Sequence, residues 1–400
     1  MSDSSPQSPA LSTPRPHRVR FRFSLKTLLL LITLMCVWLG LSYSNARRQQ
    51  RAVEAIVASH GRVGYDRDPH DEAEDLPAGM LAGPKWLRSL LGRHYFDTVV
   101  SVTLNGSRAQ GESRRFADVG HWLADLPHVQ RLELSYLEVT GDDLAFVATT
   151  VDPESLTCIE MEISDQAAAR LASASRLGHL GLNNVVISAK GVAEFKKLPK
   201  LKSFLLSCRH LEVVPIGQVP PSVETYKLGD EVVTAFLEFP ELRSLTLHAT
   251  LISDDGVKIL SRLERLVDLS IASPNITNGA MQDIVKLKNL TWLGIAYTQI
   301  GDETLNRLSE LPELKTLWLS PRVTNAGLPT VAALQKLESL YLSGKQINDL
   351  GLPHLAGMKN LKALDLQSTR ITTDGPAVKQ LQLALPNCSI RQYHPSPSFR

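Results

Sequence analysis

A phrase that returns every 24 residues constrains the fold of this chain more than any other feature. Six copies of the pattern L-x-x-L-x-L begin 24, 24, 24, 23 and 24 residues apart, at Leu242, Leu266, Leu290, Leu314, Leu337 and Leu361. Upstream copies keep a spacing of 24 from Val129, Pro153, Leu177 and Leu201, and a degenerate last copy begins at Leu385. One such unit is too thin to bury its own core, so the period predicts a stack of similar units.

A second phrase runs in step with the first. Five residues after the last apolar position of each strand, or four in the case of Val323, comes a β-branched residue, followed by one that caps helix N-termini. The nine pairs are Val139-Thr140, Ile163-Ser164, Ile187-Ser188, Ile252-Ser253, Ile276-Thr277, Ile300-Gly301, Val323-Thr324, Ile347-Asn348 and Ile371-Thr372. Each unit is therefore predicted to be a short strand, a turn and a helix. Over 253–266 the helix presents Val257, Leu260, Leu263 and Leu266 at intervals of three as its inward stripe.

Together the two phrases resemble leucine-rich repeats. The subclass resembled is the helical, cysteine-containing or ribonuclease-inhibitor-like one, and the whole chain resembles bacterial leucine-rich-repeat proteins with an N-terminal membrane anchor. The resemblance implies an α/β solenoid of about 12 repeats over residues 99–390, with a parallel sheet on the concave side and helices on the convex side. Right-handed β-to-α crossovers predict a right-handed coil. The family's Asn or Cys beyond each strand is replaced by Thr250, Pro274, Thr298, Arg322, Lys345 and Thr369, so we expect a partial polar ladder there.

Two regions depart from the rhythm. Residues 207–241 are rich in proline, and we interpret them as two shortened repeats with starts at Leu201, Val223 and Leu242. Residues 44–98 precede the repeats and are predicted to form a juxtamembrane helix over 47–59 and an N-terminal cap, since the ends of a solenoid core need a cover. Residues 391–400 are a C-terminal tail.

An apolar run of 19 residues, from Leu25 to Tyr43, is predicted to be a transmembrane helix that serves as a signal anchor. At ~1.5 Å per residue it covers about 28 Å, close to the ~30 Å hydrocarbon core. Five cations precede the run and three follow it, which favours a cytoplasmic N-terminus and an exported repeat domain. The nearest flanking cations are Arg20, Arg22, Lys26, Arg47 and Arg48. Residues 1–24 are interpreted as a disordered basic cytoplasmic tail. The alternative is a signal peptide cleaved at Ser44-Asn45-Ala46.

Charge and motifs exclude several classes of function. Residues 1–51 carry a net charge of +7 and the remainder −5, so the body lacks the basic face that nucleic-acid binding needs. Four scattered cysteines predict neither a disulfide framework nor a zinc site, and no metal or cofactor is expected. No motif typical of an enzyme is present, and paired carboxylates such as Asp254 and Asp255 suit the first turn of a helix. We therefore expect a non-catalytic protein.

The outward positions of the concave strands supply the candidate site. Trp292, Trp318 and Tyr341 stand on three successive strands, ~4.8 Å apart. With Asp268, His248 and Asp365 nearby they form a hypothetical partner-binding patch, because exposed aromatic clusters often mark interfaces. In the alternative, the rings pack on one another without a ligand. The predicted function is a membrane-anchored protein-binding scaffold or receptor-like module whose partner is a protein or an envelope polysaccharide. The alternative function is a structural spacer of the cell envelope.

Overall fold

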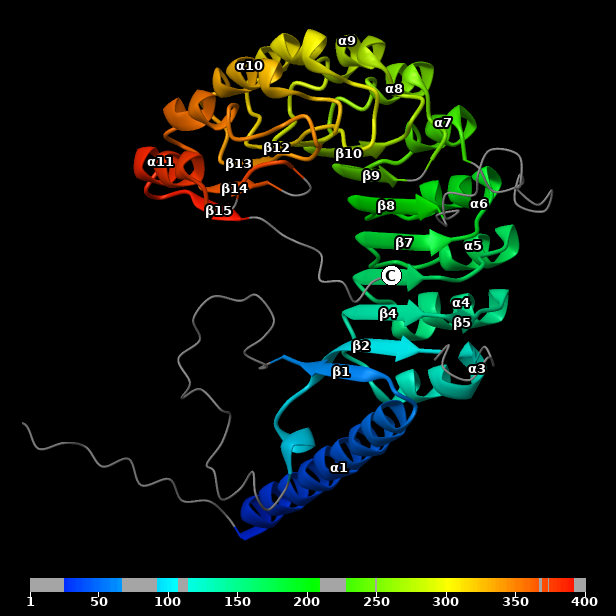
Figure 1. Ribbon diagram of the computed structural model, residues 1–400. Helices are drawn as coiled ribbons and strands as arrows, with labels where there is room; N and C mark the ends of the chain where they lie inside the picture. Colours follow the sequence, from blue (N-terminus) through cyan, green and yellow to red (C-terminus); the bar gives the residue numbers. More distant parts are fainter. Residues whose placement is uncertain are drawn as a thin grey trace, which may run out of the picture.

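The chain forms an arc of strand–turn–helix units with strands on the inner, concave side and helices on the outer, convex side (Figure 1). The computed structural model describes residues 25–66, 92–106, 114–208, 228–248, 250–366, 369–372 and 374–391. The predicted tails over 1–24 and 392–400 lie outside the described residues. The arc confirms the α/β repeat solenoid with a long, mostly parallel sheet that the period predicts.

One sheet of 13 strands lines the concave side. The first strand is antiparallel to the second, and every later pair of neighbours is parallel. In order, the strands are β1 Arg62–Tyr65, β2 Val99–Asn105, β4 Arg131–Ser135, β6 Ser155–Ile159, β7 His179–Val185, β8 Ser203–Cys208, β9 Ser244–His248, β10 Asp268–Ala272, β11 Trp292–Gly294, β12 Thr316–Trp318, β13 Ser339–Tyr341, β14 Ala363–Asp365 and β15 Ser389–Arg391. A separate two-stranded sheet joins β3 Arg114–Arg115 to β5 Leu137–Glu138.

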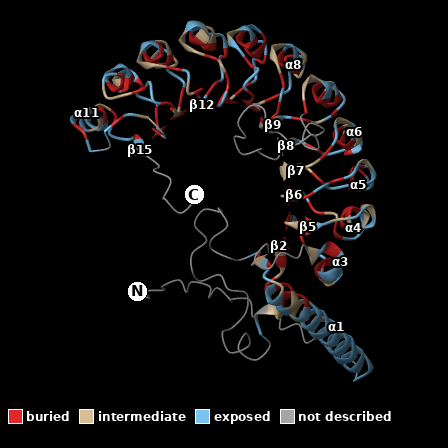
Figure 2. Ribbon diagram, turned by 45° about the vertical axis from the view of Figure 1, so that its right-hand side comes forward, coloured by how far each residue is buried: buried red, intermediate tan, exposed pale blue. Residues whose placement is uncertain are grey.

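The apolar positions of the repeat phrase hold the strands in register. Leu245, Leu269 and Leu293 pair with one another across β9, β10 and β11, and all three are fully buried. The same inward position recurs in every unit, so the core is one continuous band between sheet and helices (Figure 2). Burial of each such leucine contributes roughly 1.5–3 kcal/mol, which is why the strands pair in this register and no other.

The convex segments are shorter than predicted, and many are 3-10 helices. The predicted helix over 253–266 ends at Leu260, after which the amides of Leu263 and Leu266 donate to carbonyls three residues back, both at 2.9 Å. A 3-10 helix has three residues per turn, so an apolar residue at every third position stays on one face. The stripe at intervals of three therefore continues past the end of the α-helix, and in η9 3-10 geometry extends over nine residues from Asp302 to Glu310.

The remaining helices are described by their bounds. Between β3 and β9 lie α3 Phe116–Val119, η3 Gly120–Asp125, α4 Gly141–Phe146, the π-helical η4 Val147–Val151, α5 Asp165–Leu171, α6 Ala189–Glu194, η5 Phe195–Lys197, η7 Asp230–Val232 and α7 Val233–Phe236. After β9 come α8 Asp254–Leu260, η8 Asn278–Ala280, α9 Met281–Ile284, η9, η10 Asn325–Gly327, α10 Leu328–Ala332, η11 Leu352–Gly357 and α11 Pro376–Ala384, while η1 Arg93–Tyr95 precedes β2.

The capping residues do more than begin helices. Thr277 accepts the amide of Gly279 in its own unit, and its own amide and hydroxyl donate to the carboxylate of Asp254 in the preceding unit. Thr324 repeats this arrangement, with its amide 2.9 Å and its hydroxyl 2.6 Å from the oxygens of Asp302. The first-turn aspartates thus link neighbouring units through hydrogen bonds, and their negative charge also suits the N-terminal end of the helix dipole.

The polar ladder beyond the strands is partial, as the departure from the family pattern predicts. Thr298 and Thr369 donate to carbonyls of their own units. Ser273 and Ser320, which stand one or two residues earlier in their units, donate instead to Ile252 and Thr298 of the preceding units, at 2.7 and 2.8 Å. Serine at a shifted position therefore takes over part of the role of the missing Asn or Cys.

The interpretation of residues 207–241 as two shortened repeats is wrong. β8 and β9 are hydrogen-bonded neighbours, with Phe204 paired to Leu245, so no strand lies between them. The predicted start at Val223 lies outside the described residues, while η7 and α7 supply the helix of a single long unit. Proline spacing cannot distinguish an insertion within one unit from two short units, because both break the 24-residue rhythm.

The last strand also pairs differently from the repeat phrase. Leu364 pairs with Ile390, whereas a spacing of 24 would place it opposite Cys388. The helix before β15 is α11, an α-helix of nine residues. An α-helix rises ~1.5 Å per residue against ~2.0 Å for a 3-10 helix. The terminal unit therefore needs more residues to span the same distance.

The N-terminal helix α1 is continuous from Leu25 to Ala58 and so joins the predicted span to the predicted helix over 47–59. Its last turns bury Ala52, Val53 and Ile56 against the first unit (Figure 2). Gln49 donates to the Asp97 carbonyl at 2.8 Å. The end of α1 and β1 together cover the open end of the repeat core.

Candidate partner-binding site

The outward side chains of β9–β14 form two rows across the concave face. The first row is Ser244, Asp268, Trp292, Thr316, Ser339 and Ala363. The second is Thr246, Ser270, Gly294, Trp318, Tyr341 and Asp365. Trp318 and Tyr341 are therefore direct neighbours, whereas Trp292 begins in the other row.

A glycine brings Trp292 into line with the other two rings. A Cβ added at Gly294 would lie 2.7 Å from Cη2 and 2.8 Å from Cζ3 of Trp292, so the outer edge of the indole occupies the place of a Gly294 side chain. Gly294 pairs with Trp318, which pairs in turn with Tyr341. The three rings follow one another along the second row, and we call them the aromatic strip.

The rings of the strip are half-buried. The ring centroids of Trp318 and Tyr341 lie 5.7 Å apart with planes 32° from parallel, a tilted stack. Such pairs contribute ~0.5–1.5 kcal/mol beyond their burial, so part of the strip's area is covered by the strip itself. Tyr297 beyond β11 is different. It is 72% exposed, its φ is +54°, and it lies three residues past the end of β11 rather than on a strand.

A carboxylate flanks the strip at each end. Asp268 stands beside Trp292 in the first row, and Asp365 beside Tyr341 in the second. The Thr291 hydroxyl donates to Oδ1 of Asp268 at a long 3.5 Å. Burial raises the pKa of Asp268 above its ordinary value, and the Thr291 bond offsets part of that rise.

His248 lies at the end of β9, opposite Ala272 of β10, and does not complete a catalytic set. Its Nε2 is 2.7 Å from Oγ of Ser270, which is buried at 4% exposure. Burial lowers the pKa of His248, which makes the imidazole a weaker base. Asp268 lies opposite Ser244 at the other end of β9 and accepts from Thr291, not from His248. His248 and Ser270 therefore lack the third group that orients the base in a serine hydrolase. The imidazole instead gives the buried Ser270 hydroxyl a hydrogen-bond partner.

The predicted membrane-flanking residues lie on or before α1. Arg20 and Arg22 fall outside the described residues, while Lys26, Arg47 and Arg48 are exposed on the helix. Nε of Arg47 donates to the Tyr43 hydroxyl at 2.8 Å, and its guanidinium lies 5.2 Å from the ring centroid. In the described part of the chain, α1 is the one helix long and apolar enough to cross a membrane.

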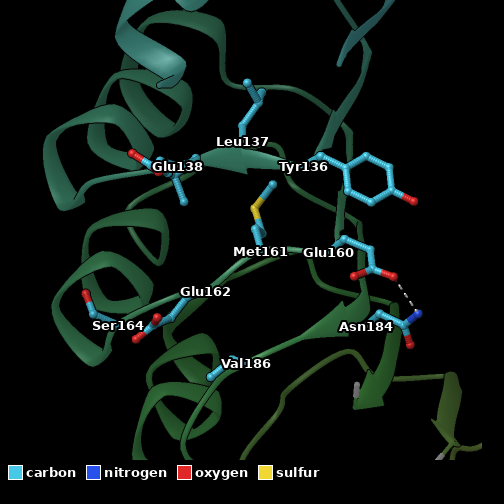
Figure 3. Close-up of a pocket in the computed structure, with 10 residues that line it drawn as sticks. Tyr136, Leu137, Glu138, Glu160, Met161, Glu162, Ser164, Asn184 and Val186 are labelled. Atoms are coloured by element: carbon cyan, nitrogen blue, oxygen red, sulfur yellow. Dashed lines mark hydrogen bonds between the residues drawn. The ribbon is translucent and has the colours of Figure 1, made fainter. Parts of the chain in front are cut away.

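A hollow of about 410 Å³ was not predicted from the sequence (Figure 3). Tyr136, Glu160 and Asn184 stand at the same position of three successive units, all with φ between +52° and +56°. Asn184 donates to Glu160 at 3.2 Å, and Glu138 and Glu162 add two further carboxylates. The 24-residue spacing of the three residues could have revealed the shared turn, but not its conformation, since tyrosine and glutamate rarely adopt it.

A second hollow lies at the edge of the sheet where the strands begin. Arg243, Arg265 and Lys315 line it together with Glu241 and Glu313. It borders the first row of the candidate site. Within the described residues, no group of three His, Cys, Asp or Glu side chains lies close enough to hold a metal ion.

Comparisons with known proteins add little to this geometry. No family model matches the chain, and no curated protein does. An internalin (inlF) from Listeria monocytogenes has a TM-score of 0.44 at 22% identity, over 69% of this chain and 70% of its own. An internalin C2 (inlC2) from the same organism has a TM-score of 0.34 at 21% identity, over 64% of this chain and 84% of its own. At these values the argument for the fold rests on the chain's own strand order and register.

Proposed function

We propose that this chain is a non-catalytic binding scaffold, anchored in a membrane by α1, that takes a protein partner on the aromatic strip. The observation that carries the proposal is the line of three rings over β11–β13, which a glycine at Gly294 makes continuous. Tryptophan and tyrosine dominate interface hot spots because they bury a large area at low rotamer cost. A purely structural core would hold these rings on the inward face instead.

Two other functions have some support. Hydroxyl side chains on the same rows, Ser244, Thr246, Thr316 and Ser339, are suited to the hydroxyls of an envelope polysaccharide. The partial mutual burial of Trp318 and Tyr341 suits a structural spacer without a ligand. The protein partner is favoured over the spacer because a spacer needs no aromatic side chains on a solvent-facing row.

The hand of the coil, the subclass of repeat and the membrane topology are part of the same proposal. We propose a right-handed coil and the ribonuclease-inhibitor-like subclass, the latter supported by the helical convex segments of each unit. The span over 25–43 is proposed as a retained anchor with the repeats exported. Ser44, Asn45 and Ala46 lie inside the continuous α1, and a helical backbone does not present a peptide bond in the extended form that a peptidase needs.

The anchor is tested by protease treatment of spheroplasts that express the chain with a C-terminal tag. External protease should destroy the body, and the intact tagged protein should have a mass that includes residues 1–46. A body that survives until the membrane is lysed would place the concave face in the cytoplasm.

Binding by the strip is tested by capture from a cell-envelope extract. Replacement of Trp292, Trp318 and Tyr341 by Ala should abolish capture of a defined partner and leave the fold intact. Tyr297→Ala is the matched control, because that ring is exposed but lies off the strip. Capture that is equal for the triple variant and wild type would favour the spacer.

A further inference from the structure

The charge pattern of the concave face points to the kind of partner. Across β9–β14 the two outward rows contain the carboxylates Asp268 and Asp365, and in the next strand Arg391 pairs with Asp365. His248 lies at the end of β9 beside Ser270, and burial lowers its pKa, so it adds little positive charge. The end of the aromatic strip at Trp292 and Asp268 is therefore its negative end.

Rings and carboxylates attract the same type of group. The face of an indole carries a partial negative charge and draws a cation within about 6 Å of its centre. Trp292 stands beside Asp268, and Tyr341 beside Asp365. A cation held at the Trp292 end of the strip would meet a ring and a carboxylate together, whereas Arg391 stands beside Asp365 at the other end.

The carboxylate of Asp268 has neither a short hydrogen bond nor an opposite charge beside it, and a bound cation would supply that charge. It is half-buried, and its hydrogen-bond partner among the described residues is the neutral Thr291 hydroxyl at 3.5 Å. No lysine or arginine of the described residues lies within ion-pair distance of its carboxylate. Withdrawal of a carboxylate from water is unfavourable unless an opposite charge or strong hydrogen bonds replace the water. The raised pKa of this group is consistent with that state.

The cations of the neighbouring edge limit how a ligand can lie. Arg243, Lys315 and Lys362 each precede the first row by one residue. Lys362 is paired with Glu338 at 2.7 Å, while Arg243 is exposed. Glu241 and Glu313 lie at the same edge, so its charge is mixed and a basic ligand is drawn to Asp268 rather than to the edge where the strands begin.

We propose that the aromatic strip binds an extended, lysine- or arginine-bearing segment of a protein partner, with one cation seated between the Trp292 ring and Asp268. The proposal rests on the proposed function of the strip and deepens it by naming the partner's chemistry. A neutral polysaccharide is the rival occupant.

The test uses the full chain in lipid nanodiscs and labelled peptides of twelve residues, (Arg-Gly-Ser)4, (Gln-Gly-Ser)4 and (Glu-Gly-Ser)4, with fluorescence anisotropy as the readout. The arginine peptide should bind at least about tenfold more tightly than the other two. Asp268→Asn should weaken it about tenfold, the effect expected for one partly buried charge pair. Asp255→Asn on the convex side is the matched control and should change nothing, since Asp255 is an exposed carboxylate away from the strip.

The remaining outcomes separate this proposal from the proposed function. Equal binding of the arginine peptide to wild type and Asp268→Asn, or no binding to wild type, overturns the basic ligand. Chitohexaose that binds wild type and is lost in Trp318→Ala would overturn it too, yet would keep the strip as a binding site. If Trp318→Ala affects neither the peptide nor the sugar, both proposals fail.

Discussion

The indole of Trp292 lies where a side chain of Gly294 would stand, two residues further along the same strand. Gly294→Val should therefore push Trp292 off the second row and break the aromatic strip. Two of the blocking atoms belong to the far end of the Trp292 side chain, which can move, the third is Oγ of Ser270 at 2.9 Å, and valine is favoured in strands. We expect a change of less than about 1 kcal/mol in the free energy of unfolding, with loss of partner binding.

The measurement is quenching of tryptophan emission by acrylamide, alongside a urea titration. Gly294→Val should make emission more accessible to the quencher while the unfolding midpoint stays close to that of wild type. Gly357→Ala is a suitable control, because nothing lies within 4 Å of a Cβ added there. An unchanged quenching profile would show that Trp292 does not depend on the glycine.

The sequence predicted the strands well and the strip only in part. Inward leucines such as Leu245 and Leu269 recur at a fixed spacing and are buried by one another, so their register follows from the repeat alone. Trp292 and Trp318 occupy different positions within their units, and alignment of the units already places them in different rows. The two rings nevertheless follow one another, because Gly294 leaves room for the indole of Trp292. This packing cannot be deduced from the alignment of the units.

Asp268 is expected to lower the stability of the fold. Because burial raises its pKa above the ordinary 3.8, the ionised form is disfavoured in the folded state. The destabilisation is absent below the unfolded pKa, grows as the pH rises from the unfolded pKa to the folded pKa and is constant above it. Asp268→Asn should therefore raise the unfolding midpoint at pH 7 and should give no such gain near pH 3.

Urea titrations of wild type and Asp268→Asn from pH 3 to pH 8 would measure this difference directly. The Asp255→Asn variant controls for the general effect of removing one negative charge. A gain in stability that does not vary with pH would mean that burial of the Asp268 carboxylate is not its cause. Together with weaker binding, the expected result would make Asp268 a residue that trades stability for function.

Asp254 and Asp255 are adjacent aspartates in the first turn of α8, and their roles could not be distinguished from the sequence alone. In the structure Asp254 accepts the amide and the hydroxyl of Thr277 in the next unit, whereas Asp255 is exposed. Asp254→Ala should lower the free energy of unfolding by about 1–3 kcal/mol, since it leaves donors of Thr277 without their acceptor. Asp255→Ala should stay within about 0.5 kcal/mol of wild type.

Hydrogen exchange would locate the effect as well as measure it. Protection should fall in the units that contain Thr277 and its neighbours for Asp254→Ala only, because a solenoid transmits stability between adjacent units. Equal losses for the two alanine variants would leave the helix dipole as the common explanation.

The end of α1 is predicted to hold the solenoid rigidly to its anchor. Ile56 is fully buried against the first unit, whereas Val57 beside it is 55% exposed. Ile56→Ala should destabilise the first unit by about 2–5 kcal/mol, the cost of a large-to-small change in a core, and Val57→Ala should be nearly neutral.

The readout is amide exchange of β2, which pairs with β1 just after α1 and should lose protection in Ile56→Ala alone. Because α1 contains no break between Tyr43 and Ile56, such a loss would mean that the helix proposed as the anchor also closes the repeat core. Unchanged protection of β2 would instead mean that the anchor and the solenoid are joined without mutual support.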